Sequence, residues 1–319
     1  MGDEEQAEDV RDPGEPIWGE DRVSYSPIVE RPRFAWPGGA RVALWVVPNI
    51  EHYEYLPEYR VRDPWPRMPA PDVLGYGLRD YGNRVGLWRL FEVMDHFGIR
   101  CTSSLNLAVF EHYPQILEAC EARQWDVMGH GLYNTRYHWN LGEDDERAEI
   151  EKCVEIMRRR TGRMLQGWFS PSATFTQNTP DLVAEAGMKY YCDWYHDDQP
   201  TPMAVRNGSL ITIPYQMDIN DAMVYRHAIE ADDFARMTMD HFDCVYREGA
   251  DRPMVMCIAI HPYLIGQPHR IRHLEKALEH ILSHSGVWLA TGEEIADWYI
   301  ANGLPAMKVH LRRGEGRGK

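Results

Sequence analysis

The sequence predicts an α/β fold, a (β/α) barrel of seven or eight parallel strands surrounded by helices. One reason is that short apolar runs alternate with segments of helical periodicity along most of the chain. Another is that polar residues able to do chemistry follow the apolar runs, and the C-terminal ends of barrel strands share one face. The number of repeats over 319 residues favours a barrel over an open sheet. Neither a G-x-G-x-x-G after the first strand nor a Walker-type loop is present, so nucleotide binding has no support.

The first predicted strand is the apolar run Val42–Pro48, which follows the pair Gly38-Gly39. It is too short for a helix and rich in apolar residues throughout, which is typical of a parallel strand buried on both faces. Asn49 and Glu51 come where the run stops. A buried strand that carries polar groups at its C-terminal end is what a barrel needs to build a site.

The segment Tyr53–Asn83 follows, rich in Pro, Tyr and Trp. It is too long for an ordinary connection, which predicts a functional loop or a lid. The residues 87–97 then have apolar positions at helical spacing, and Gly98 follows as a helix-ending glycine.

The remaining elements repeat this alternation to the end of the domain. Further strands are predicted over Ile99–Leu105, Trp125–Gly129, Met164–Phe169, Met188–Trp194, Leu210–Pro214, Met254–Ile260 and Val287–Ala290. Further helices are predicted over 114–123, 150–157, 179–187, 234–245 and 271–282, and a capping box at Thr291 and Glu294 opens the last one.

The domain prediction is one barrel over residues 36–302, since no linker and no internal repeat divides this range. Residues 1–35 are charged and Pro-rich, and they predict a poorly packed acidic arm over the body or over a neighbouring subunit. Residues 303–319 are assigned as a C-terminal tail.

Composition excludes some partners. The chain has 49 acidic and 34 basic residues and a net charge of −15, which argues against nucleic acid or an anionic membrane as a partner. The six cysteines are scattered without a C-x-x-C pair, which is typical of reduced core residues. The acidic N-terminus lacks the apolar region of a secretory signal, and no apolar run reaches the length of a membrane span. We therefore expect a cytoplasmic protein that acts on a small molecule.

Candidate site residues are those that follow the predicted strands. Glu51, His130 and His261 are the candidate catalytic residues, because a carboxylate and imidazoles can transfer protons. The candidate substrate-binding residues are Asn49, Asn134, Ser170, Asp193, His196, Asp198 and Asn220.

A family resemblance is carried by seven segments: NIE, YGNRVGLWRL, MGHGLYN, GWFSP, CDWYHDDQP, LITIPYQMDIND and IHPYLIGQPHRI. Over residues 30–302 they resemble the polysaccharide deacetylase (NodB-homology) superfamily. Within it, the chain looks like the cytosolic allantoinase-type branch, which hydrolyses amides of small or cyclic molecules. The resemblance implies a distorted (β/α) barrel and a homo-oligomer, a dimer or a tetramer.

The sequence departs from the metal-dependent members at several motif positions. Asn49 and Glu51 stand where those members carry an Asp-Asp pair, and their H-x-x-x-H becomes His130 and Asn134. Ser170 stands in place of their usual Arg. A shell of Glu51 and His130, with Asn134 as a weak oxygen donor, falls short of the three firm ligands of a catalytic zinc site. We expect no tightly bound cofactor; the alternative is a divalent metal such as zinc on Glu51 and His130.

The leading hypothesis is a hydrolase of a non-peptide carbon–nitrogen bond in a cyclic amide, ureide or imide. Glu51, buried beside little positive charge, would have a raised pKa and act as general base. His261 would protonate the leaving nitrogen or stabilise the oxyanion, and His130 would orient the water or the carbonyl.

Two alternatives stay open. One is a metal-dependent N-deacetylase of an amino sugar, which the missing second histidine and the missing secretion signal disfavour. The other is a non-catalytic barrel that binds a small molecule or serves as a scaffold. The polar residues at the strand ends argue against that reading.

Overall fold

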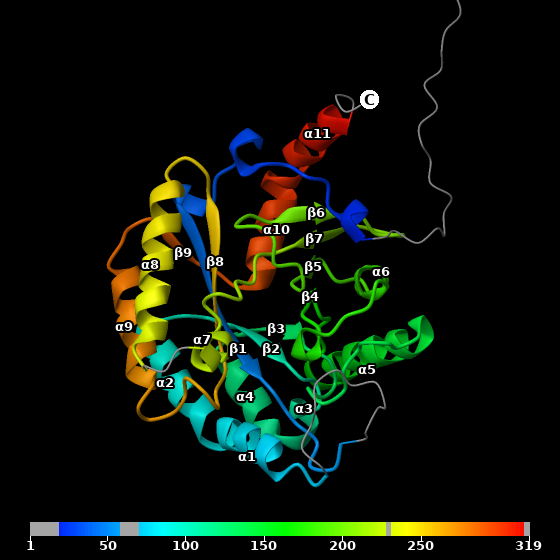
Figure 1. The fold of residues 1–319 in the computed structure, drawn as a ribbon, viewed down its shortest axis with the longest axis vertical. Helices are drawn as coiled ribbons and strands as arrows, with labels where there is room; N and C mark the ends of the chain where they lie inside the picture. The colour runs from blue at the N-terminus through cyan, green and yellow to red at the C-terminus, as the bar shows by residue number, and fades with distance from the viewer. Residues whose placement is uncertain (1–18, 58–69, 228–230, 316–319) are drawn as a thin grey trace, which may run out of the picture.

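The computed structural model describes residues 19–57, 70–227 and 231–315, shown as a ribbon in Figure 1. Within these ranges the strands are β1 Val42–Ile50, β2 Thr102–Leu105, β3 Asp126–Gly129, β4 Gly167–Trp168, β5 Tyr190–Tyr191, β6 Thr201–Met203, β7 Leu210–Thr212, β8 Met254–Ile260 and β9 Val287–Leu289. The α-helices are α1 Val73–Tyr81, α2 Leu87–Phe97, α3 Val109–His112, α4 Pro114–Ala122, α5 Glu143–Thr161, α6 Thr179–Glu185, α7 Asp221–His227, α8 Asp233–Glu248, α9 Ile271–Leu282, α10 Gly292–Asn302 and α11 Leu304–Glu315.

The strands form one curled sheet in the order β6-β7-β5-β4-β3-β2-β1-β8, and β9 also pairs with β1. All described pairings are parallel except that of β6 with β7. Helices surround the curled sheet (Figure 1). The predicted distorted (β/α) barrel is confirmed, and the antiparallel edge strand β6 is an addition that the sequence pattern did not predict.

Strand β1 is the spine of the sheet, and all nine of its residues are buried. It pairs with β8 from Val42 to Pro48 and with β2 through Asn49 and Ile50. Alternate side chains serve different cores, because successive residues of a strand point to opposite faces. Val42, Leu44, Val46 and Ile50 belong to one buried cluster, while Ala43, Trp45 and Val47 belong to another.

The second cluster contains large aromatic rings. Trp45 packs edge-on against Tyr190, with ring centroids 6.4 Å apart, and Phe169 stacks on Tyr215 at 4.4 Å. The inside of the curled sheet is therefore packed with side chains, as in other barrels of this size.

The curl of the sheet brings the residues after β7 close to β8, and a side chain connects the two. In the described part of the chain no backbone ladder links these two strands. Instead, the Gln216 side chain donates from Nε2 to the Val255 carbonyl (3.0 Å) and accepts at Oε1 from the Cys257 N–H (2.6 Å). This amide makes the two hydrogen bonds that a neighbouring strand would make. The sheet is thus a curled half-barrel without a ladder across this gap.

The N-terminal segment packs against the body from residue 19 onward, while residues 1–18 of the predicted arm lie outside the described residues. Arg22 is buried and pairs with Asp181 of α6, its NH2 nitrogen 2.7 Å from Oδ2. Arg31 pairs with Asp197 at 2.6 Å. At the other end, Leu304–Glu315 of the predicted tail is the helix α11. No described helix is long and apolar enough to cross a membrane.

The predicted loop Tyr53–Asn83 contains the helix α1, which continues into a π-helix at Gly82–Gly86; residues 58–69 lie outside the described part. The Asp72 side chain caps α1 by accepting from the Gly75 N–H. A Cβ at Gly86 would lie 2.0 Å from the Pro262 carbonyl oxygen. Because only glycine allows this approach, α1 and the π-helix pack directly against the loop that follows β8.

Candidate active site

Glu51 follows β1 directly, and its side chain is buried with two cationic partners. Its Oε1 lies 3.4 Å from Nε2 of His261, and its Oε2 lies 3.2 Å from Nε of Arg79. The backbone carbonyl of Glu51 accepts a hydrogen bond from Asn83 Nδ2 at 2.9 Å. Backbone and side chain are therefore both fixed, which holds the carboxylate in one orientation.

His261 follows β8 and is held from behind by Asp221, the first residue of α7. The His261 Nδ1 lies 2.6 Å from Asp221 Oδ1, and Asp221 is fully buried. The other oxygen of Asp221 accepts from the backbone N–H groups of His261 (2.9 Å) and Ile265 (3.2 Å). Asp221, His261 and Glu51 thus form a continuous chain in which Asp221 orients the imidazole towards Glu51.

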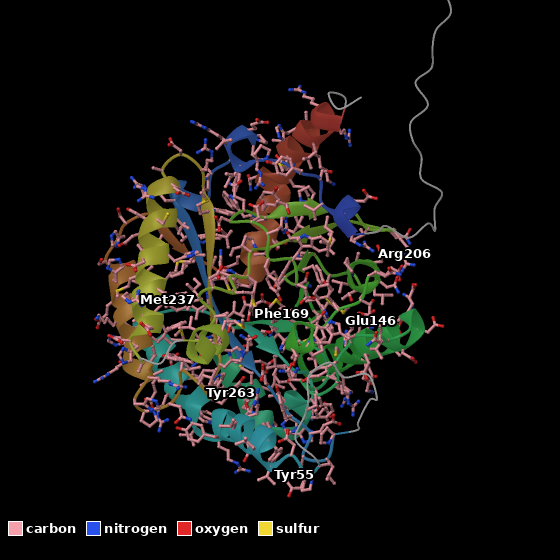
Figure 2. The ribbon with its side chains drawn as sticks, viewed as in Figure 1. Tyr55, Glu146, Phe169, Arg206, Met237 and Tyr263 are labelled. Carbon is pink, nitrogen blue, oxygen red and sulfur yellow. The ribbon has the colours of Figure 1, made fainter. Side chains whose placement is uncertain are left out.

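Arg79 comes from α1 and covers the far side of Glu51. Its NH2 nitrogen donates to the hydroxyls of Tyr53 (2.8 Å) and Tyr263 (3.1 Å). Its guanidinium carbon lies 3.8 Å from the centroid of the Tyr53 ring and 4.3 Å from that of Tyr263, which is labelled in Figure 2. The guanidinium is therefore held between two aromatic faces and against a carboxylate.

These contacts fix the charges of the site. Burial alone would raise the pKa of Glu51, but the hydrogen bond from His261 and the charge of Arg79 outweigh it and lower the pKa to about 2. Burial opposes the charged form of His261, yet Asp221 and Glu51 raise its pKa to about 9. At neutral pH the site therefore holds a carboxylate and an imidazolium. The predicted raised pKa of Glu51 is wrong, because Arg79 and His261 supply the positive charge that was expected to be absent.

His130 follows β3 and is neutral. Its Nδ1 donates to the Phe169 carbonyl at 2.8 Å, and its ring stacks on that of Phe169, labelled in Figure 2, with centroids 4.8 Å apart. Burial lowers the pKa of His130 to about 4. Because Nδ1 carries the proton, Nε2 keeps its lone pair, and no described residue hydrogen-bonds to it. The charges of Glu51 and His261 both act on this ring, so the three candidate catalytic residues lie in one site.

Asn49 and Asn134 both make side-chain hydrogen bonds within the protein. Asn49 Nδ2 donates to the Tyr215 hydroxyl at 2.8 Å inside the sheet. Asn134 Oδ1 accepts from the backbone N–H of Ser172 at 2.8 Å. Ser172 has a φ of 52°, so this bond holds a backbone position that non-glycine residues rarely adopt.

Ser170 and Asp193 also bind each other. The Ser170 N–H donates to both oxygens of Asp193, at 2.9 and 3.2 Å, and its hydroxyl accepts from the indole N–H of Trp168. Burial raises the pKa of Asp193 to about 6. The carboxylate of Asp193 thus fixes the backbone at Ser170 and connects the chain after β4 to the chain after β5.

The last three predicted substrate residues lie at different places. Asn220 Oδ1 accepts from the Ala222 N–H (2.9 Å) at the start of α7, beside Asp221. His196 is bound to Thr201 of the edge strand β6, with 3.1 Å between Nε2 and Oγ1. The Asp198 carbonyl accepts from Val255 near the start of β8, whereas His261 follows its end. Asp198 is therefore near the opposite end of β8 from His261, away from the other site residues.

Two residues of the site, Asp221 and Arg79, are not among the predicted catalytic or substrate-binding residues. Asp221 ends the segment LITIPYQMDIND and follows a predicted strand, and this position was the available signal. Arg79 stands two residues before the segment YGNRVGLWRL, but its neighbourhood was interpreted as a loop. Its role depends on α1, which brings it back against β1.

The donor set does not fit a catalytic zinc ion. Both oxygens of Glu51 face cationic partners, and Asn134 Oδ1 is occupied by the Ser172 N–H. Among the described residues, no three ligand atoms of the site come within 4.8 Å of one another as the atoms of a metal cluster do. Glu51 and His130 alone provide fewer ligands than a catalytic zinc requires.

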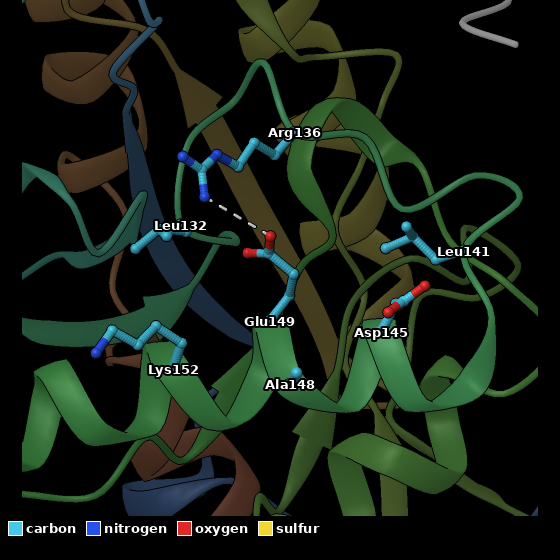
Figure 3. Close-up of a pocket in the computed structure, with 7 residues that line it drawn as sticks. All are labelled: Leu132, Arg136, Leu141, Asp145, Ala148, Glu149 and Lys152. Carbon is cyan, nitrogen blue, oxygen red and sulfur yellow. Dashed lines mark ion pairs between the residues drawn. The ribbon is translucent and has the colours of Figure 1, made fainter. Parts of the chain in front are cut away.

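A surface hollow of ≈ 670 Å³ lies beside the loop that follows His130. It is lined by Leu132, Arg136, Leu141, Asp145, Ala148, Glu149 and Lys152 (Figure 3). Arg136 NH1 lies 3.8 Å from Glu149 Oε1, and Arg136 NH2 lies 2.9 Å from Glu54 Oε1. The hollow contains none of the site residues, and its ion pairs attach the loop to α5 and to the residues after β1.

Comparisons with known proteins agree with this fold. Residues 79–191 match the family model described as polysaccharide deacetylase. The chain is 29% identical over 300 residues to a putative polysaccharide deacetylase of Schizosaccharomyces pombe, covering 83% of this chain and 92% of the relative. It is 26% identical over 265 residues to a peptidoglycan deacetylase of Helicobacter pylori, covering 72% and 88% of the two chains. The crystal structure of PuuE allantoinase superposes with a TM-score of 0.76 at 29% identity, covering 85% of this chain and 94% of that one.

Proposed function

We propose that this chain, whose residues 79–191 match the polysaccharide deacetylase family model, hydrolyses a carbon–nitrogen bond other than a peptide bond. The proposed substrate is a cyclic amide, ureide or imide, as for an allantoinase. The similarity to PuuE allantoinase over most of both chains supports this substrate class. The observation that carries the proposal is the chain of contacts from Asp221 through His261 to Glu51, since it joins a proton donor to a carboxylate without needing a metal.

In the proposed reaction, Glu51 takes a proton from water as the water oxygen bonds to the carbonyl carbon. His130 accepts a second hydrogen bond from that water through Nε2, which keeps its lone pair because Nδ1 donates to Phe169. Two acceptors hold the water with one lone pair towards the substrate, which is the orientation that attack requires.

The carbon–nitrogen bond then breaks, and His261 gives its Nε2 proton to the leaving nitrogen. Its pKa of about 9 keeps this proton in place at neutral pH, and Asp221 stabilises the cation. Glu51 Oε1 and His261 Nε2 are 3.4 Å apart, so the proton taken from water passes back to His261 and restores both groups. The balance is one water consumed and one carbon–nitrogen bond cleaved.

In the proposed reaction, Arg79 exchanges its contact with Glu51 for a contact with the substrate carbonyl oxygen. A guanidinium stabilises the negative oxygen that forms on the carbonyl during attack. If Arg79 turns from Glu51 towards that oxygen, the carboxylate loses a charge that lowers its pKa. Glu51 then becomes a stronger base at the moment when the substrate is bound.

A substrate screen tests the proposal. The purified protein is assayed against allantoin, hydantoins, cyclic imides and N-acetylated amino sugars, each with and without a metal chelator. We expect turnover of a cyclic ureide, amide or imide that the chelator leaves unchanged and that Glu51→Gln abolishes. Turnover of none of these compounds, together with unchanged ligand binding by Glu51→Gln, would overturn the enzyme assignment and favour a binding or scaffold role.

The second candidate is an amino-sugar N-deacetylase, which the names of the two curated relatives favour. The same screen separates it from the first. Turnover of N-acetylated sugars alone, abolished by the chelator and restored by zinc, would replace the ureide proposal. The occupied oxygens of Glu51 and Asn134 argue against that result.

A further inference from the structure

A group of metal-ligating side chains lies outside the candidate active site, where α8 and α9 run side by side on the outer surface (Figure 1). It consists of Asp243 on α8, His280 on α9 and His284, two residues after α9 ends. Each offers one ligand atom, and these atoms all lie within 4.8 Å of one another. His280 lies in the last turn of α9 and His284 just beyond it, and their imidazole rings are neighbours.

The hydrogen bonds of His284 involve its Nδ1, which contacts the His280 carbonyl and Ser283 Oγ, and leave its Nε2 available. His284 Nδ1 lies 3.0 Å from the His280 carbonyl oxygen. A carbonyl oxygen can only accept, so Nδ1 carries the proton and Nε2 presents a lone pair. A backbone carbonyl that fixes the tautomer of a histidine in this way is the usual outer partner of a metal-bound imidazole. His280 Nε2 lies 2.7 Å from Asp243 Oδ1, so these two ligand atoms already face each other.

Aromatic neighbours hold both imidazole rings. The Phe242 ring centroid lies 5.9 Å from that of His280 and 5.1 Å from that of His284, and Tyr246 lies 5.1 Å from His284. The two imidazoles are themselves 5.1 Å apart. His280 and Asp243 remain 32% and 55% exposed, so an ion can enter from solvent without the helices separating.

We propose that Asp243, His280 and His284 bind a divalent transition-metal cation of the zinc type. Two imidazoles and one carboxylate suit zinc, copper or nickel better than magnesium or calcium, which prefer oxygen ligands. Water completes the coordination, because the group supplies three protein ligands. The site is distinct from the candidate active site: Gly286, two residues beyond His284, is bonded to Arg41 just before β1 begins, whereas Glu51 follows the end of β1. A metal ion bound here would link α8, through Asp243, to α9, through His280.

Calorimetric titration of the untagged, chelator-treated full chain with zinc chloride tests this site. We expect wild-type protein to bind one equivalent at this site, and His284→Ala to weaken that binding at least about tenfold. Asp243→Asn also weakens it. His269→Ala, which changes an exposed histidine outside the group, and Glu51→Gln, which changes the candidate active site, keep the wild-type affinity.

Circular dichroism of each variant checks folding, and Asp243→Asn tests the site if His284→Ala does not fold. Cobalt(II) absorption gives a second measurement, since its visible bands report nitrogen and oxygen ligands. Those bands are expected in wild-type protein and in His269→Ala and are expected to be lost in His284→Ala. Zinc affinity that His284→Ala and Asp243→Asn leave unchanged, or that Glu51→Gln removes, would overturn the proposal.

Discussion

Two histidine–aspartate pairs in this protein have nearly the same length but different surroundings. His261 and Asp221 are 2.6 Å apart with side chains 7% and 0% exposed, whereas His280 and Asp243 are 2.7 Å apart and 32% and 55% exposed. Water screens the exposed pair, and such pairs contribute little to stability. The buried pair interacts in a low dielectric, where the charges shift the pKa of His261 to about 9. Burial, rather than distance, makes the first pair suited to proton transfer.

The largest expected effect comes from Glu51→Gln, which removes the carboxylate at the end of the buried chain. The amide cannot accept the proton of water, so we expect kcat to fall by about 10²–10⁴-fold on the substrate that the screen identifies. The amide keeps the size of the side chain, so thermal unfolding serves as the control for folding. A variant with full kcat would remove Glu51 from the mechanism.

Asp221→Asn breaks the buried pair by removing one charge and leaving the other. Breaking a buried pair by removing one member costs about 3–5 kcal/mol of unfolding free energy. Only Glu51 then remains beside the imidazolium, so the pKa of His261 falls towards its ordinary value. Denaturant unfolding measures the first effect, and the pH dependence of kcat measures the second. An unfolding free energy and a pH profile like those of the wild type would show that burial does not strengthen this pair.

The pH dependence follows from the two shifted pKa values. The folded pKa of His261 is raised from 6.5 to about 9, so its contribution to stability is complete below 6.5 and is lost as pH rises through about 9. The folded pKa of Glu51 is lowered from 4.5 to about 2, so its contribution is complete above 4.5 and is lost as pH falls through about 2. We also expect kcat to fall above about pH 9, as His261 loses its proton. A pH–rate profile that stays flat from pH 7 to about pH 10 contradicts the assigned role.

The smallest expected effect is that of Asp243→Asn without added metal. An exposed pair of this kind is worth about 0–1 kcal/mol, so the unfolding free energy should change by less than about 1 kcal/mol. Denaturant unfolding in the presence of a chelator measures the unfolding free energy of Asp243→Asn, and Asp221→Asn is measured in the same way for comparison. If Asp243→Asn lost as much unfolding free energy as Asp221→Asn, burial would not explain the difference between the two pairs.

The strands and helices that the sequence predicted best are those with apolar side chains on a clear period. The predicted bounds of β8 and α9 agree with the structure, because both are long and strongly patterned. Strand β6 was missed since it has three residues with Pro202 in the middle. Helix α1 was missed since the segment that contains it, Tyr53–Asn83, is rich in Pro, Tyr and Trp and predicts a loop.

The error in the charge around Glu51 follows in part from that missed helix. Glu51, His130 and His261 were found because each directly follows a strand, and strand ends meet at one face. Arg79 is 28 residues from Glu51 along the chain and reaches it only through α1. Without Arg79 the charge around Glu51 was misjudged, and so was its pKa. A local sequence pattern predicts where strands end, but it does not predict which residues distant in sequence will contact those ends.

The contact between Gln216 and β8 can open in a way that a strand ladder cannot. A side chain can swing away by rotating about its own bonds, at the cost of the two hydrogen bonds to Val255 and Cys257. A strand ladder at the same place would have to unzip several residues together. The outer edge of β8, the strand that His261 follows, is therefore held at this place by side-chain hydrogen bonds that can break one at a time. Substitution of this glutamine removes these two hydrogen bonds and leaves every ladder of the sheet in place, while the Val255 N–H still donates to the Asp198 carbonyl.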